Sequence, residues 1–185
     1  MELRIASGQF NRAPILIPAQ AATLFRPTGQ RVRNAVAQVL GMRIADAHVG
    51  DFCAGSGAFG FEMLSRGAAW VDFIEQNRIL AAAIKENALR LKCADRCTVV
   101  AGDVLQYIDT CEKRYDIIYC DPPYENSAVY AGIPAMAVLL APSGVLLVER
   151  RKEKSRRTSG APTLEGLQCQ SREYGDTVVD IYWRG

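Results

Sequence analysis

From residue 46 onward, the sequence alternates between short apolar segments typical of buried strands and longer amphipathic segments with helical periodicity. The predicted strands are Ala47–Phe52, Trp70–Glu75, Cys97–Ala101, Tyr115–Cys120 and Val145–Glu149, and the predicted helices lie at 55–66, 77–91, 103–111 and 128–140. This alternation predicts an α/β fold with a mostly parallel sheet and helices on both faces. Two final segments, 167–174 and 177–183, predict an antiparallel hairpin at one edge.

The 185 residues suffice for one domain with a small appendage. We assign residues 46–185 to the α/β domain and residues 1–45 to an N-terminal basic arm made of a hairpin and a helix. Thr28 is the expected N-cap of the arm helix. Its apolar stripe contains Val32, Val36, Val39 and Leu40. Arg31 and Arg33 fall outside this stripe, so we expect both to face solvent.

Positive charge is confined to two segments of the chain. Residues 1–45 contain six arginines and one acidic residue, and residues 150–157 contain six basic residues and one acidic residue. The rest of the chain is net acidic. This pattern indicates that one face of the molecule meets phosphates, as in a nucleic-acid-binding protein. The alternative is a solvated loop and a solvated helix face.

Several classes of protein do not fit the composition. No uninterrupted apolar segment reaches 18 residues, and the first residues lack a signal-peptide pattern, so we expect neither a membrane span nor export. The six cysteines are scattered, and His48 is the only histidine. We therefore expect no metal site and reduced thiols in a cytoplasmic protein.

A glycine-rich turn follows the first predicted strand of the domain. Residues 51–60 contain the pattern G-x-G-x-x-G between a strand and a helix, and Glu75 ends the next strand. These features fit either a nicotinamide nucleotide or S-adenosylmethionine, since Glu75 could accept both ribose hydroxyl groups. Asp51 could attract a cationic sulfonium and amino group, and Asp103 could accept from an adenine amine. A nicotinamide enzyme would also need a hydride-transfer site, and nothing in the sequence marks one.

The sequence Asp121-Pro122-Pro123-Tyr124 follows the predicted strand Tyr115–Cys120. Neither proline has an N–H group, so the Asp121 carboxylate and the Pro122 carbonyl can both accept hydrogen bonds from a ligand. Tyr124 adds a planar face on which a ring could stack. Acceptors beside an aromatic ring suit a planar amine such as a nucleobase. The alternative is a turn that only ends the strand.

Taken together, these motifs resemble the bacterial small-subunit rRNA (guanine-N2) methyltransferases. The resemblance rests on 26–33, 51–60, 64–68, 121–124 and 174–177, and it covers nearly the whole chain. It implies a Rossmann-like methyltransferase fold with S-adenosylmethionine as methyl donor. It also implies that one guanine of 16S rRNA, free or in an assembling small subunit, is the substrate. We expect the protein to be a monomer.

We assign the site residues on this basis. The expected catalytic turn is Asp121, Pro122, Pro123 and Tyr124. The expected cofactor-binding residues are Asp51, Ala54, Gly55, Ser56, Gly57, Glu75, Asp103 and Val104. The expected RNA-binding residues are Arg26, Thr28, Arg31, Arg33, Arg150 and Arg151. Two other functions stay open: methylation of adenine N6 in DNA or RNA, and RNA binding without catalysis.

Overall fold

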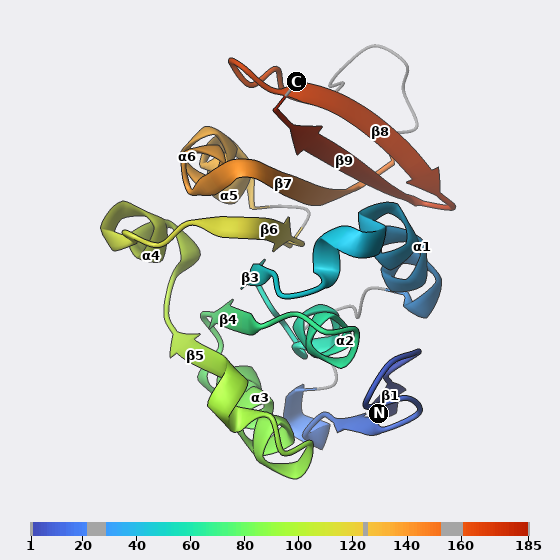
Figure 1. Cartoon of the computed structure of the whole chain (residues 1–185). Coiled ribbons are helices and arrows are strands. Elements are labelled where there is room, and N and C mark those ends of the chain that lie inside the picture. Colours follow the sequence, from blue (N-terminus) through green and yellow to red (C-terminus); the bar gives the residue numbers. More distant parts are fainter. Residues whose placement is uncertain (1, 22–28, 124–125, 153–160, 185) are drawn as a thin grey trace.

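The computed structural model describes residues 2–21, 29–123, 126–152 and 161–184 (Figure 1). Its main feature is a seven-stranded sheet with the order β5-β4-β3-β6-β7-β9-β8. The strands are β3 (His48–Phe52), β4 (Trp70–Glu75), β5 (Cys97–Ala101), β6 (Tyr115–Cys120), β7 (Leu140–Arg151), β8 (Gln168–Tyr174) and β9 (Thr177–Trp183). Strands β3 to β7 are parallel, and the β8–β9 hairpin joins β7 in antiparallel pairing. The predicted fold class is confirmed.

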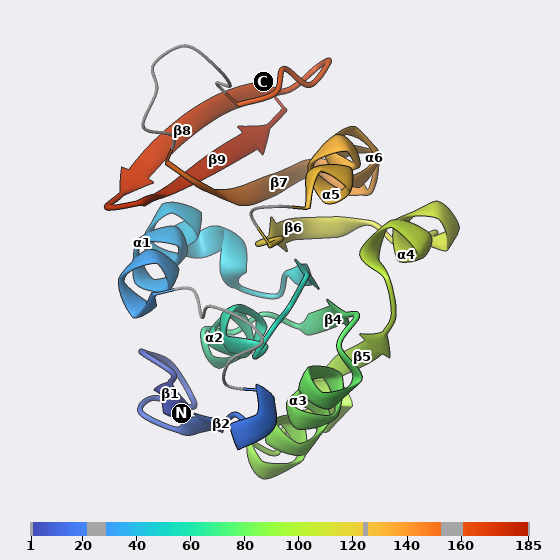
Figure 2. The same ribbon diagram turned by 180° about the vertical axis from the view of Figure 1, so that it is seen from behind.

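Helices cover both faces of the sheet, as the two opposite views show (Figures 1 and 2). One face packs against α1 (Gln30–Leu40), α2 (Ala58–Ser65) and α3 (Arg78–Arg90), and the other against α4 (Val104–Thr110), α5 (Ser127–Ala131) and α6 (Ile133–Val138). The short 3-10 helices are η1 (Ala19–Ala21), η2 (Gly41–Ile44) and η3 (Ala94–Arg96). Because both faces of the inner parallel strands β3, β4 and β6 are buried along most of their length, the sequences of these strands are nearly continuous apolar runs. Within the described residues, no helix combines the length and apolarity needed to cross a membrane.

The N-terminal hairpin, β1 (Glu2–Arg4) with β2 (Pro14–Leu16), is fixed to the domain by buried polar side chains. Glu62 of α2 accepts a hydrogen bond from the Ala6 amide at 2.7 Å, and Ser65 accepts one from the Phe10 amide at 2.8 Å. Asn87 of α3 bonds both the amide and the carbonyl of Leu16. A buried backbone needs such partners, so α2 and α3 determine where the arm lies.

Helix α1 differs from the prediction in two respects. Its N-cap is Gly29, which has no side chain to cap the helix. Thr28, the predicted N-cap, lies outside the described residues. Arg33 does not face solvent, because its side chain is buried and donates to the Arg4 carbonyl at 3.2 Å. In a helix, residue 33 lies on the same face as Ala37 and Leu40, and both of these are buried. The buried face of α1 is therefore wider than the predicted stripe.

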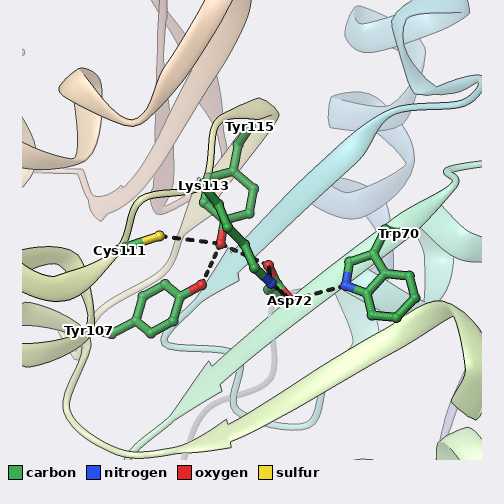
Figure 3. Close-up of polar contacts among 6 residues, drawn as sticks. All are labelled: Trp70, Asp72, Tyr107, Cys111, Lys113 and Tyr115. Carbon is green, nitrogen blue, oxygen red and sulfur yellow. Dashed lines mark hydrogen bonds and ion pairs between the residues drawn. The ribbon is translucent and has the colours of Figure 1, made fainter.

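A second buried polar cluster joins β4 to the connection between α4 and β6 (Figure 3). The carboxylate of Asp72, which is 1% exposed, accepts hydrogen bonds from Trp70 Nε1, from the Tyr115 hydroxyl at 2.8 Å and from Lys113 Nζ at 2.7 Å. The Tyr115 hydroxyl also bonds the Tyr107 hydroxyl. Burial raises the pKa of both tyrosines, so they remain neutral donors. The cluster thus offsets the cost of one buried carboxylate with three donors.

Candidate functional site at the carboxyl ends of the strands

A cavity of about 820 Å³ lies at the carboxyl ends of the parallel strands. Six carboxylates line it, and the sheet order places them in the sequence Asp103, Glu75, Asp51, Asp121, Glu149 and Asp176. Of the described residues, Arg31 is the only basic one in the wall. This negative wall favours a cationic ligand and disfavours a pyrophosphate. It therefore argues against a nicotinamide dinucleotide, which the glycine pattern alone left open.

Glu75 at the end of β4 holds the glycine-rich turn in place. Its two carboxylate oxygens accept hydrogen bonds from the Gly55 amide at 2.7 Å and from the Asn77 amide at 2.8 Å. Burial raises the pKa of Glu75, and these two amide donors offset part of that rise. A carboxylate oxygen can accept more than one hydrogen bond, so Glu75 can shape the turn and still accept from hydroxyl groups in the cavity.

The glycine-rich turn presents Ala54, Gly55 and Ser56 to the cavity. Gly57 is different. It is not part of the cavity wall, and it caps α2 with a φ of 73°. A side chain there would come within 3.0 to 3.2 Å of Phe61, Ile84 and Phe73. Gly57 thus lets α2 pack closely against the sheet, and its cofactor-binding role stays a prediction.

Asp51 and Asp103 lie on either side of Glu75 in this wall. Asp51 is buried and accepts from the Gly60 amide at 2.9 Å. Burial raises its pKa well above the usual value, and the nearby charges of Asp121 and Glu75 raise it further. Asp103 caps α4 by accepting from the Leu105 and Gln106 amides, and it lines the cavity together with Val104. Capping and ligand contact are therefore compatible roles for Asp103.

The Pro-Pro turn forms the next part of the wall. Asp121, Pro122 and Pro123 all line the cavity, and Tyr124 lies outside the described residues. The Asp121 amide donates to the Phe52 carbonyl at 3.4 Å, and the Pro123 carbonyl accepts from the Asn126 amide at 2.8 Å. These contacts tie the turn to the end of β3 and to the start of α5.

The far wall contains residues that the sequence did not lead us to assign. The ring of Tyr119 stacks on Phe59 with centroids 4.0 Å apart, and its hydroxyl donates to Glu149. Thr177 lies near the other oxygen of Glu149 at 3.5 Å. Tyr174 and Asp176 of the β8–β9 turn complete this wall. Glu149 is the last residue of the predicted apolar strand Val145–Glu149, so the signal that identified Asp121, an acid at the end of an apolar run, could also have identified Glu149.

The predicted RNA-binding arginines have different environments. Arg31 is exposed and lines the cavity, and Arg151 is exposed at the end of β7. Arg150 instead donates through Nε and Nη2 to the buried carboxylate of Asp180, at 2.6 and 3.2 Å. Arg33 lies on the buried face of α1. We therefore withdraw Arg33 and Arg150 as phosphate ligands, because Arg33 is buried and the guanidinium of Arg150 is paired with the buried carboxylate of Asp180. Arg26 lies outside the described residues.

Comparisons with known proteins agree with this geometry. The profile of the family described as "Conserved hypothetical protein 95" matches residues 3–183. Ribosomal RNA small subunit methyltransferase D of Escherichia coli K12 is 30% identical over 99% of this chain and 90% of its own length. The protein of the same name from Haemophilus influenzae is 30% identical over 83% of this chain and 81% of its own length.

Solved structures show the same relationship. A protein of Escherichia coli, provisionally described as a methyltransferase, superposes with a TM-score of 0.85 at 28% identity, covering 100% of this chain and 98% of its own. A similarly described methylase from Haemophilus influenzae gives a TM-score of 0.81 at 25% identity over 100% of this chain and 99% of its own. The fold is thus the Rossmann-like methyltransferase fold. The chain belongs to the family that includes ribosomal RNA small subunit methyltransferase D.

Proposed function

We propose that this protein transfers a methyl group from S-adenosylmethionine to the exocyclic N2 amine of a guanine in 16S rRNA, acting as a monomer. The observation that carries the proposal is the single cavity in which the glycine-rich turn and the Pro-Pro turn meet. A methyl donor and an acceptor amine need adjacent sites with different chemistry, and the two turns supply them. The names of the relatives from Escherichia coli and Haemophilus influenzae support ribosomal RNA as the substrate.

The residues of the first half of the cavity fit S-adenosylmethionine. This cofactor carries a positively charged sulfonium, which makes its methyl group electrophilic. Asp51 supplies a carboxylate beside the turn, Glu75 supplies acceptors for ribose hydroxyls, and Asp103 with Val104 supplies an acceptor and an apolar contact for adenine. A cation is favoured in a wall of carboxylates, whereas each carboxylate alone is costly to bury.

The Pro-Pro turn fits a planar amine. The lone pair of such an amine is delocalised into the ring, so the nitrogen is a poor nucleophile until it becomes pyramidal. Hydrogen bonds from its N–H groups to the Asp121 carboxylate and the Pro122 carbonyl favour that change and stabilise the positive charge that develops on nitrogen. Backbone hydrogen bonds hold the turn at the end of β3 and at the start of α5, so these acceptors are in place before the substrate binds. A base within a stem must leave the stack to reach them.

The test is transfer of a labelled methyl group to unmodified 16S rRNA and to small subunits assembled from it, followed by nucleoside analysis. We expect label in N2-methylguanosine. Label in N6-methyladenosine would replace the proposal with the adenine alternative. If calorimetry shows no binding of S-adenosylmethionine, the protein is an RNA-binding protein without this activity.

Replacement of Glu75 by alanine should weaken cofactor binding by about 1.5–3 kcal/mol, as expected for loss of charge-assisted hydrogen bonds. The structure adds a second reason for weaker cofactor binding, because Glu75 also accepts a hydrogen bond from the Gly55 amide and so holds the glycine-rich turn. Calorimetry with S-adenosylmethionine measures the effect, and kcat should change little. Glu86→Ala, at an exposed position on α3, is the control. Unchanged affinity in Glu75→Ala would show that Glu75 has no contact with the cofactor.

Replacement of Arg31 by alanine should weaken binding of the rRNA and reduce the slope of log affinity against log salt by about one unit, as expected for loss of one phosphate contact. Arg31 is the exposed arginine at the cavity edge, so its loss should not change cofactor affinity. Arg114→Ala is the matched control, because this exposed arginine precedes β6 at the opposite edge of the sheet. Equal slopes for Arg31→Ala and wild type would exclude Arg31 as a phosphate ligand.

A further inference from the structure

Glu149 is a buried carboxylate in the cavity wall beside the proposed catalytic turn. Cys120 of β6 and Val148 of β7 form the last pair between these parallel strands, so Asp121, just after β6, lies beside Glu149 of β7. Such strands lie about 4.8 Å apart. Both residues line the cavity, and Glu149 is 3% exposed. A substrate amine held at Asp121 would therefore have Glu149 as the neighbouring polar group on the side of β7.

The Glu149 side chain is held in a defined position. The Tyr119 hydroxyl donates to one of its oxygens, and the stack of Tyr119 on Phe59 fixes that donor. Thr177 approaches the other oxygen from the start of β9. Burial lowers the pKa of Arg33, and the nearby charge of Glu149 opposes this shift. Contacts from separate elements of this kind are typical of a residue that must meet a ligand at a fixed angle.

Guanine and adenine differ at the position that such a carboxylate would meet. The C2 amine of guanine is flanked by the ring N1–H, which is a hydrogen-bond donor. The C6 amine of adenine is flanked by an N1 lone pair, which is an acceptor. An ionised carboxylate can only accept, so it binds the first arrangement and repels the second. We propose that Glu149 accepts the N1–H of the target base and thereby selects guanine over adenine. This inference rests on the proposed function of the same cavity.

The test compares two RNAs that differ at the target base. The probe is a short 16S rRNA fragment that carries the nucleotide labelled in the methyl-transfer experiment, made with either guanine or 2-aminopurine at that position. The base 2-aminopurine keeps the C2 amine, but its N1 has no hydrogen. Wild-type enzyme should methylate the guanine RNA about 10- to 100-fold more efficiently, as expected for one lost specific contact to a base. Equilibrium binding of the two fragments should differ in the same direction.

The variant Glu149→Gln should reduce this preference to within a few-fold, because the amide can donate to an unprotonated N1 and accept from N1–H. The analogue also lacks the guanine O6, but that difference is common to both enzymes and cancels between them. Glu173→Gln is the control, since Glu173 is in an exposed ion pair with Lys152 at 2.6 Å, and it should keep the wild-type preference. Calorimetry with S-adenosylmethionine shows whether each variant is folded.

The outcomes separate this inference from the proposed function. If neither enzyme methylates the guanine RNA, the proposed function fails. If both methylate it but the preference is the same in wild type and Glu149→Gln, Glu149 does not read N1 and the inference is overturned. A wild-type enzyme that treats both RNAs alike would overturn it without any variant, even if Glu149→Gln did not fold.

Discussion

Replacement of Asp121 by asparagine should lower the rate of methyl transfer about 100- to 1,000-fold, the usual effect of losing one positioned electrostatic contact. Asparagine keeps the shape of the side chain, but an NH₂ group replaces one carboxylate oxygen and cannot accept from the substrate amine. The negative charge that stabilises the developing positive charge on nitrogen is also lost. Asp121 sits on a turn fixed by two backbone hydrogen bonds, so the protein cannot easily present a substitute acceptor.

Single-turnover transfer of labelled methyl to 16S rRNA measures this effect, with cofactor affinity measured separately by calorimetry. Affinity should change little, because the donors to Glu75 and Asp51 come from the glycine-rich turn, its helix α2 and the start of α3. Asp116→Asn is the matched control: it makes the same change near the start of β6, the strand that leads to Asp121, at an exposed position on the opposite edge of the sheet. Turnover near the wild-type value in Asp121→Asn would remove Asp121 from the mechanism.

The fold could be predicted because the sequence patterns of its strands and helices are local. The inner parallel strands β3, β4 and β6 are buried on both faces along most of their length, so an apolar run such as 115–120 identifies them without knowledge of their neighbours. The same strands explain why part of the site could be predicted. A carboxylate after a buried strand lies at the ligand-binding edge of such a sheet, and Asp51, Glu75, Asp103 and Asp121 all reach one cavity.

The burial and the partners of the arginines could not be predicted from the sequence. Arg33 and Arg150 belong to basic segments, and charge alone suggested a role at the surface for both. Their environments depend on acids far away in the chain: Asp180 binds Arg150, and Glu62 and Glu149 lie near Arg33. A buried guanidinium is tolerated where such partners exist, but no local pattern reveals them. The structure was therefore needed to separate the exposed Arg31 and Arg151 from Arg33 and Arg150.

Replacement of Lys113 by methionine should destabilise the protein by about 3 kcal/mol, at the low end of the range for breaking a buried ion pair. The change leaves the buried carboxylate of Asp72 with only the neutral donors Trp70 and Tyr115 (Figure 3). The side chain of Lys113 is itself 50% exposed, which is why we do not expect the full range. Unfolding in urea measures the difference. A loss below about 1 kcal/mol would place this pair among ordinary surface ion pairs.

Three further variants determine whether the unpaired charge of Asp72 causes this loss of stability. Lys152→Met breaks an ion pair of nearly the same length, 2.6 Å against 2.7 Å, but both of its partners are exposed, so it should cost less than about 1 kcal/mol. The double variant Lys113→Met with Asp72→Asn removes the unpaired charge while keeping an acceptor for the Tyr115 hydroxyl. It should be more stable than Lys113→Met alone, because an amide costs less to bury than a carboxylate. Asp72→Asn alone completes the comparison. If the effects of Lys113→Met and Asp72→Asn were additive in the double variant, the lost packing of the lysine chain would explain the effect, and the charge of Asp72 would not.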